Sequence, residues 1–130
     1  MSLIIDIPNA LTHTPLLPAQ AASNNSSAGL DLKGFNGVVA VDVSISALTG
    51  TTPSLALSLQ SSADTNVSNS VAFSPAIAIQ PQTSNSNSAL QTLAVDTRVS
   101  SRYLFAIPVL TGTNAAGTVA AIVVGQKHVH

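Results

Sequence analysis

The feature that most constrains this chain is a strict alternation of apolar and polar residues in its first half. Residues 37–47 alternate along their length, and their apolar face consists of Val39, Val41, Val43 and Ile45. Residues 54–61 repeat the pattern with an apolar face made of Leu55, Leu57 and Leu59. A period of two is that of a β-strand with one buried face. Because residues 48–53 contain turn-forming threonine, glycine and proline, the two strands are predicted to form a hairpin.

Further apolar segments follow, and each is bounded by polar or turn-forming residues. Residues 71–79 are interrupted by Pro75 and are predicted at a sheet edge or bulge, and residues 90–95 form another candidate strand. Residues 102–110 alternate again, and their predicted core face consists of Tyr103, Phe105, Ile107 and Val109. A loop then leads to residues 118–124, so a second hairpin is predicted. Seven or eight short strands without a helical period predict an all-β fold, a single antiparallel β-sandwich or jelly-roll-like domain.

The N-terminal part differs from the rest because it combines a short apolar run with three prolines and a polar cluster. Proline fixes φ and removes a backbone donor, which disfavours a regular sheet element. Residues 1–27 are therefore predicted to be an extended arm, and residues 28–130 the β-sandwich domain. The alternative is a terminal strand that lies on its own sandwich. An arm can reach a neighbouring subunit, and its apolar residues are the predicted assembly contacts: Leu3, Ile4, Ile5, Ile7, Pro8, Leu16 and Leu17.

Charge is scarce throughout the chain, with only 7% charged residues and a formal net charge of −1. So few basic groups cannot neutralise the several phosphates that nucleic-acid binding needs, so no nucleic-acid partner is expected. No apolar run reaches the length of a membrane span, and the first eight residues lack the features of a signal peptide. Synthesis in a cytoplasm is expected. A nearly neutral surface repels other copies weakly, so it favours self-association.

The chain contains few side chains that could act in catalysis. The chain has no cysteine, and its three histidines are His13, His128 and His130, none at the end of a confidently predicted strand. Asp31, Asp64 and Asp96 lie near predicted strand ends and are interpreted as turn formers rather than calcium ligands. Arg102 and Tyr103 open a predicted strand, and we interpret them as structural, with the arginine at a sheet edge or paired with an aspartate. We therefore expect no enzyme activity, no cofactor, no metal site and no small-molecule substrate.

Several segments together resemble a known family. Residues 28–37 read AGLDLKGFNG and lead into the valine-rich strand, and residues 49–54 read TGTTPS and lead into a leucine-rich strand that ends in the SSAD of residues 61–64. With the later Arg102-Tyr103-Leu104, this pattern resembles small β-sandwich virion proteins of tailed bacteriophages, of the head decoration or cement kind. The resemblance covers roughly residues 28–102. The chain departs from it in lacking a tryptophan after the SSAD loop and in its low charge.

The resemblance implies a structural role and brings no catalytic residues with it. A decoration or cement protein would associate with itself and with a major capsid protein, and would be located in the virion after synthesis in the host cytoplasm. Alternatives within the virion are a shell-forming subunit and a tail or fibre component. A further alternative is a non-enzymatic carbohydrate-binding module, although sugar stacking needs exposed aromatic rings, and the chain has only Phe35, Phe73, Tyr103 and Phe105.

Overall fold

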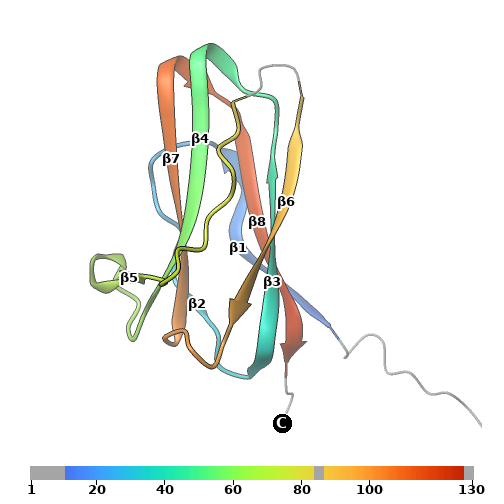
Figure 1. The fold of residues 1–130 in the computed structure, drawn as a ribbon, viewed down its shortest axis with the longest axis vertical. Coiled ribbons are helices and arrows are strands. Elements are labelled where there is room, and N and C mark those ends of the chain that lie inside the picture. Colours follow the sequence, from blue (N-terminus) through green and yellow to red (C-terminus); the bar gives the residue numbers. More distant parts are fainter. Residues whose placement is uncertain (1–10, 84–86, 128–130) are drawn as a thin grey trace, which may run out of the picture.

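The computed structural model describes residues 11–83 and 87–127, and these residues form two antiparallel sheets packed face to face (Figure 1). The first, sheet A, has the order β1 (Thr12–Ala21), β8 (Thr118–Lys127), β3 (Phe35–Ile45) and β6 (Ala89–Asp96). The second, sheet B, has the order β2 (Leu30–Asp31), β7 (Tyr103–Ala116), β4 (Thr49–Ser62) and β5 (Val71–Ala72). A short 3₁₀ turn, η1 (Val67–Asn69), precedes β5. The predicted all-β sandwich is confirmed.

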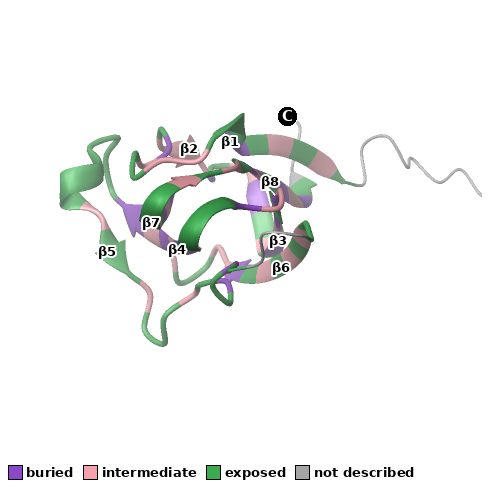
Figure 2. Cartoon of the chain, turned by 90° about the horizontal axis from the view of Figure 1, so that it is seen from above, coloured by how far each residue is buried: buried purple, intermediate pink, exposed green. Residues whose placement is uncertain are grey.

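The strand order is that of a jelly roll. Four antiparallel pairs are nested inside one another along the chain, namely β1 with β8, β2 with β7, β3 with β6, and β4 with β5. Two further pairings, β3 with β8 and β4 with β7, join these ribbons side by side into the two sheets. Such nesting is what results when one long antiparallel ribbon is rolled over itself, the double Greek key of jelly rolls. Figure 2 shows the resulting layers from above, with β4 and β7 of one layer beside β3 and β8 of the other.

The core lies between the two sheets and is aliphatic. On β3 the predicted face is buried as expected, since Val39, Val41, Val43 and Ile45 are all at most 2% exposed. On β4 the leucines of the predicted face are at most 1% exposed. β8 and β6 complete the interior with Val119, Ala121, Val123 and Val95. Because β-branched and leucine side chains fill both inner faces, apolar burial is the main force that holds the layers together.

Both predicted hairpins are wrong in their pairing. β3 does not pair with β4, because residues 46–48 carry the chain from sheet A across to sheet B. In the same way, the connection at Gly117 carries the chain from β7 in sheet B to β8 in sheet A. The two crossings touch, since a Cβ added to Gly117 would lie 2.6 Å from Cδ2 of the fully buried Leu48. A crossing lets two successive strands turn their apolar faces towards one another, which a flat hairpin cannot do.

The predicted core face of β7 is also wrong, because the alternation is read in the opposite phase. Leu104 and Ala106 face the core and are completely buried. Phe105 lies on the opposite face and is also buried, under Gly29, where an added Cβ would lie 2.9 Å from the phenylalanine Cζ. Further along that outer face Val109 is 46% exposed. Both faces of this strand are apolar at the start, so periodicity alone does not indicate which one meets the core.

The predicted N-terminal arm is wrong for residues 12–21, and the alternative interpretation is correct. These residues form β1, which runs antiparallel to β8 from the pair Thr12 and Gly125 to the pair Ala21 and Thr118. β1 is an edge strand, where a missing backbone N–H is tolerated, so prolines do not prevent pairing here. They coincide with irregularities, because the register shifts twice between residues 15 and 20.

Residues 22–29 also belong to the sandwich, because they cover the free edge of β7. Asn24 Oδ1 accepts a hydrogen bond of 2.6 Å from the backbone N–H of Leu110. Ser27 donates its backbone N–H to the carbonyl of Ala106 over 2.9 Å, and its hydroxyl oxygen accepts from the Ala106 N–H over 2.8 Å. Side-chain oxygens therefore replace the carbonyls that a regular strand would supply. The sandwich thus includes residues that the predicted boundary at residue 28 assigned to the arm.

The other edge of sheet B is covered by residues 77–82. They exchange backbone hydrogen bonds with β4, including two of 2.9 Å between Leu55 and Gln82. The side chain of Gln91 on β6 then bonds both backbone groups of Gln80, donating Nε2–H to its carbonyl and accepting its N–H, each over 2.9 Å. The side-chain amide of Gln91 thus links sheet A to the segment that covers the edge of sheet B.

Candidate functional site

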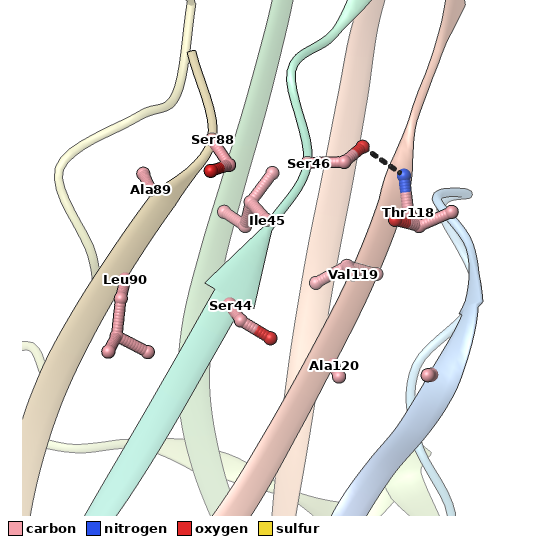
Figure 3. A pocket seen from close by; sticks show the side chains of 10 residues that line it. Ser44, Ile45, Ser46, Ser88, Ala89, Leu90, Thr118, Val119 and Ala120 are labelled. Atoms are coloured by element: carbon pink, nitrogen blue, oxygen red, sulfur yellow. Dashed lines mark hydrogen bonds between the residues drawn. The ribbon is translucent and has the colours of Figure 1, made fainter.

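A shallow groove of about 460 Å³ lies on the outer face of sheet A, at the end where β3 finishes and β8 begins. Its lining comes from all four strands of the sheet and includes Ser44, Ser46, Ser88, Leu90, Thr118 and Ala120. In Figure 3, Leu90 lies at one side of the groove and Thr118 at the other. The hydroxyl of Ser46 accepts the backbone N–H of Thr118 over 2.9 Å and donates to its neighbour's carbonyl over 3.1 Å. The lining carries no ionisable side chain, so the groove suits a neutral or apolar group.

The groove continues into a wider surface that we call the outer face of sheet A. The strand register places its residues in rows, because Ser44, Asp42 and Ala40 of β3 lie opposite Ala120, Ile122 and Val124 of β8. The same three residues lie opposite Leu90, Thr92 and Ala94 of β6 on their other side. On β1, Pro15 pairs with Ile122 and His13 with Val124. Most of these side chains are apolar, and Asp42 and His13 are the ionisable ones among them.

Large apolar side chains are exposed on this face. Leu90 is 72% exposed, Val38 60% and Ile122 40%. The rows of this face contain few ionisable side chains. The carboxylate of Asp42 accepts a 2.8 Å hydrogen bond from the Thr92 hydroxyl, and His13 is exposed on the edge strand β1. Several exposed apolar side chains on one sheet face are more typical of an interaction site than of an ordinary solvent-facing sheet.

The predicted assembly contacts fall elsewhere. Leu16 and Leu17 are 3% and 2% exposed and pack in this chain's own core, so they are not available to a partner in this structure. That part of the prediction is wrong for a simple reason: these leucines form the buried part of β1 rather than the surface of an arm. The other predicted contacts lie outside the described residues, namely Leu3, Ile4, Ile5, Ile7 and Pro8.

Arg102 pairs with an aspartate, as predicted. Its guanidinium forms a bidentate ion pair with Asp31, with Nε to Oδ1 at 3.0 Å and Nη2 to Oδ2 at 2.9 Å. It also lies 5.2 Å from the centre of the Tyr103 ring. The hydrogen bonds from Arg102, together with the backbone N–H of Lys33, lower the pKa of Asp31 from 3.8 to about 2. The pair fastens β2 to the start of β7.

The other two aspartates singled out in the sequence also form turns. Asp96 pairs with Arg98, which lowers the pKa of this carboxyl group through hydrogen bonds from the guanidinium and the backbone N–H. Asp64 accepts hydrogen bonds from the Asn66 N–H, the Asn69 amide and the Ser62 hydroxyl, and these lower its pKa as well. Each carboxylate is thus held by its own loop.

Residues 11–83 and 87–127 contain neither a metal-binding cluster nor a membrane-spanning helix. No group of three or more His, Cys, Asp or Glu side chains in these ranges is arranged to hold a metal ion. No helix there is long and apolar enough to cross a membrane. His128 and His130, two of the three histidines of the chain, lie outside the described residues.

Sequence reasoning missed the exposed residues of the outer face of sheet A. The available signal was in residues 118–124, where both phases of the strand are apolar, with Ile122 and Val124 on the face opposite Val123. In a sandwich of two layers only one face of each strand can meet the core. A strand that is apolar on both faces therefore indicates a second surface that something else covers.

Comparison of the chain with protein-family models, with curated proteins and with solved structures found no match. The family resemblance drawn from residues 28–102 therefore remains a prediction.

Proposed function

We propose that this chain is a structural protein of a virus particle, a decoration or cement subunit on the head of a tailed bacteriophage. The observation that carries the proposal is the nested eight-strand jelly roll, an architecture that viral capsid proteins share with lectins and cupins. The sequence resemblance of residues 28–102 supports the assignment to phage particles. In this role the chain stabilises a shell through contacts with other copies of itself and with the major capsid protein.

The surface of the sandwich agrees with a role in assembly. A chain with 7% charged residues presents few groups that lose solvation when a neighbour covers them. The outer face of sheet A adds exposed apolar side chains on a rigid four-stranded support. A shell-forming subunit or a tail component would use the same properties, and these remain the alternatives within the virion. A decoration is favoured because a shell subunit needs larger interfaces than one small sandwich face supplies.

The carbohydrate-binding alternative has one observation in its favour and one against. The groove on sheet A offers the hydroxyls of Ser44, Ser88 and Thr118, which could bond a sugar. Its lining has no aromatic ring on which a sugar could stack, and Phe35 and Phe105 are buried elsewhere. A glycan array probed with the purified chain tests this function, and reproducible binding that Ser44→Leu abolishes would replace the assembly role with it.

The direct test is location. Antibodies raised against the purified chain should label intact particles of the virus that encodes it, seen by immunogold electron microscopy. The chain should also remain with the particles through a density gradient. Recovery only in the unsedimented fraction, with unlabelled particles, would refute the proposal.

A further inference from the structure

We propose that the outer face of sheet A is the surface through which two copies of this chain associate, packed face to face about a two-fold axis. The inference deepens the proposed function and rests on it, because it names the surface and the partner of an assembly role. The partner is a second copy of the same chain.

The first argument is the shape of the face. Leu90 projects from the edge strand β6 with 72% of its area exposed, and the groove lies beside it, floored by small side chains such as Ala120 and Ser44. β6 and β8 are the two neighbours of β3. A two-fold axis running along β3 therefore places Leu90 of each copy over β8 and the groove of the other. It also brings the Asp42 carboxylates of the two copies towards one another, each hydrogen-bonded to the hydroxyl of Thr92. A projection and a matching hollow on the same surface are the requirement for an isologous contact.

The second argument is area. Four strands about 4.8 Å apart and about eight residues of each, at about 3.3 Å per residue, give a face of roughly 500 Å² on each copy. Two such faces bury on the order of 1,000 Å², which is the lower limit for a specific interface and far below that of an obligate dimer. The small area and the opposed Asp42 carboxylates together predict a weak, reversible dimer.

The third argument is that sheet B does not offer an equivalent surface. Both edges of its outer side are built up, by residues 22–29 along β7 and by residues 77–82 along β4. Among the apolar side chains of its strands, Val109 of β7 and Val71 of the two-residue β5 are exposed, while Phe105 is covered. The open, flat and apolar side of the sandwich is therefore sheet A. Val109 also provides a matched control, since its 46% exposure is close to the 40% of Ile122 and both lie in a strand paired on both sides.

The test is sedimentation velocity on the full-length chain over a wide concentration range. The wild-type chain should pass from monomer to dimer as concentration rises. Ile122→Lys should raise the dissociation constant at least tenfold, and Val109→Lys should leave it within about twofold. Circular dichroism and thermal melting establish that each variant is folded. If Ile122→Lys does not fold, Ile122→Thr keeps the β-branched shape and should weaken the dimer in the same direction.

Cross-linking gives an independent readout, because the natural chain has no cysteine. Stacked sheets lie about 10 Å apart, which is too far for a disulfide, so a short bis-maleimide is the reagent. Ser44→Cys, close to the proposed axis, should give cross-linked dimers. Ser58→Cys, on the outer side of β4, should give none above background.

Several results would overturn the interface. These are a monomer at every concentration, a dimer that survives Ile122→Lys, equal loss with both lysine variants, and a dimer that is lost when residues 1–10 are deleted but not in Ile122→Lys. The last would assign association to the N-terminal segment. The proposed function is judged separately by labelling of particles, so a monomeric chain present on particles would refute the interface alone.

Discussion

Ser27 offers a sharp test of how the edge of sheet B is completed. This serine is 7% exposed, and its hydroxyl oxygen accepts the backbone N–H of Ala106, a residue that is completely buried. The substitution Ser27→Ala removes the acceptor and leaves that N–H without a partner. Because the donor is buried, water cannot easily replace the lost oxygen. The substitution should therefore destabilise the fold although it removes a single atom from a segment with little regular structure.

The magnitude follows from the burial of the donor. An unsatisfied buried N–H costs about 1–3 kcal/mol, whereas an exposed one costs close to nothing. For a domain of this size 1 kcal/mol corresponds to roughly 3–5 °C in Tm, so a decrease of about 3–15 °C is expected. Ser26→Ala is the matched control. Ser26 is only half-buried and lies next to Ser27, so its substitution should change Tm by less than about 2 °C.

Two measurements check the prediction. Urea unfolding followed by circular dichroism gives the free energy of unfolding of the two variants and the wild-type chain. Hydrogen exchange monitored by NMR should show a selective loss of protection at the amide of Ala106 in Ser27→Ala. If Ser27→Ala is as stable as Ser26→Ala and the Ala106 amide stays protected, the side chain of Ser27 does not complete the sheet edge and the reasoning is wrong.

Three further predictions follow from contacts described above. Because the folded-state pKa of Asp31 is about 2, below its ordinary 3.8, its ion pair stabilises the fold above about pH 4 and the contribution disappears towards pH 2. The side chain of Asp31 is 41% exposed, so the free energy of unfolding should fall by about 1 kcal/mol or less between these pH values, as measured by urea unfolding. In Asp31→Asn this pH dependence should disappear. Gln91→Ala should lower the free energy of unfolding by about 1 kcal/mol and expose the amide of Gln80 to hydrogen exchange. Unchanged protection of that amide would show that the hydrogen bonds between Gln91 and Gln80 do not link the two sheets. Gly125→Ala should lower stability by about 1–3 kcal/mol, because the added carbon would lie 2.5 Å from Val39 Cγ1, and an unchanged melting temperature would contradict this packing.

The buried faces of the central strands could be predicted from the sequence because they depend on local order alone. In β3, three valines and one isoleucine occupy every second position from residue 39 to residue 45. They therefore point to the same face of the strand and are buried together. In β4 three leucines do the same. Alternation of this kind fixes which side chains point inward, whatever the neighbouring strand is. The all-β class of the fold follows from it.

The partners of these strands could not be predicted, because alternation does not specify them. The run after β3 contains turn residues that suit a hairpin equally well, and only the need to bring two apolar faces together makes the chain cross between the sheets. In β7, Leu104 and Phe105 are both buried, so either phase satisfies a search for apolar residues. In the structure Leu104 faces the core, and Phe105 lies on the outer face of β7, where Gly29 packs against its ring.

The candidate surface was hidden from the sequence for a related reason. Apolar content alone placed the predicted contacts in residues 3–17, where Leu16 and Leu17 in fact serve the core. Ile122 and Leu90 become surface residues only because β8 and β6 have their other faces against the interior. Whether an apolar side chain in a strand is core or contact thus depends on the layer to which the strand belongs, which the order of residues does not state.

The nested pairing has a consequence for the birth of the protein on the ribosome. β8 lies between β1 and β3 in sheet A, yet it follows the other strands of the sandwich in the sequence and is synthesised after them. Until they leave the exit tunnel, the aliphatic faces of β1 and β3 have no central strand, and the loop that joins β1 to β8 spans nearly the whole domain. Closing so long a loop is entropically costly and kinetically slow. The sandwich can therefore close only once β8 has been synthesised, and the nearby pair of β4 and β5 should form before the pair of β1 and β8. A nascent chain that stalls before β8 would expose the interior valines to other chains, so removal of β8 should lower expression more than the small loss of mass suggests.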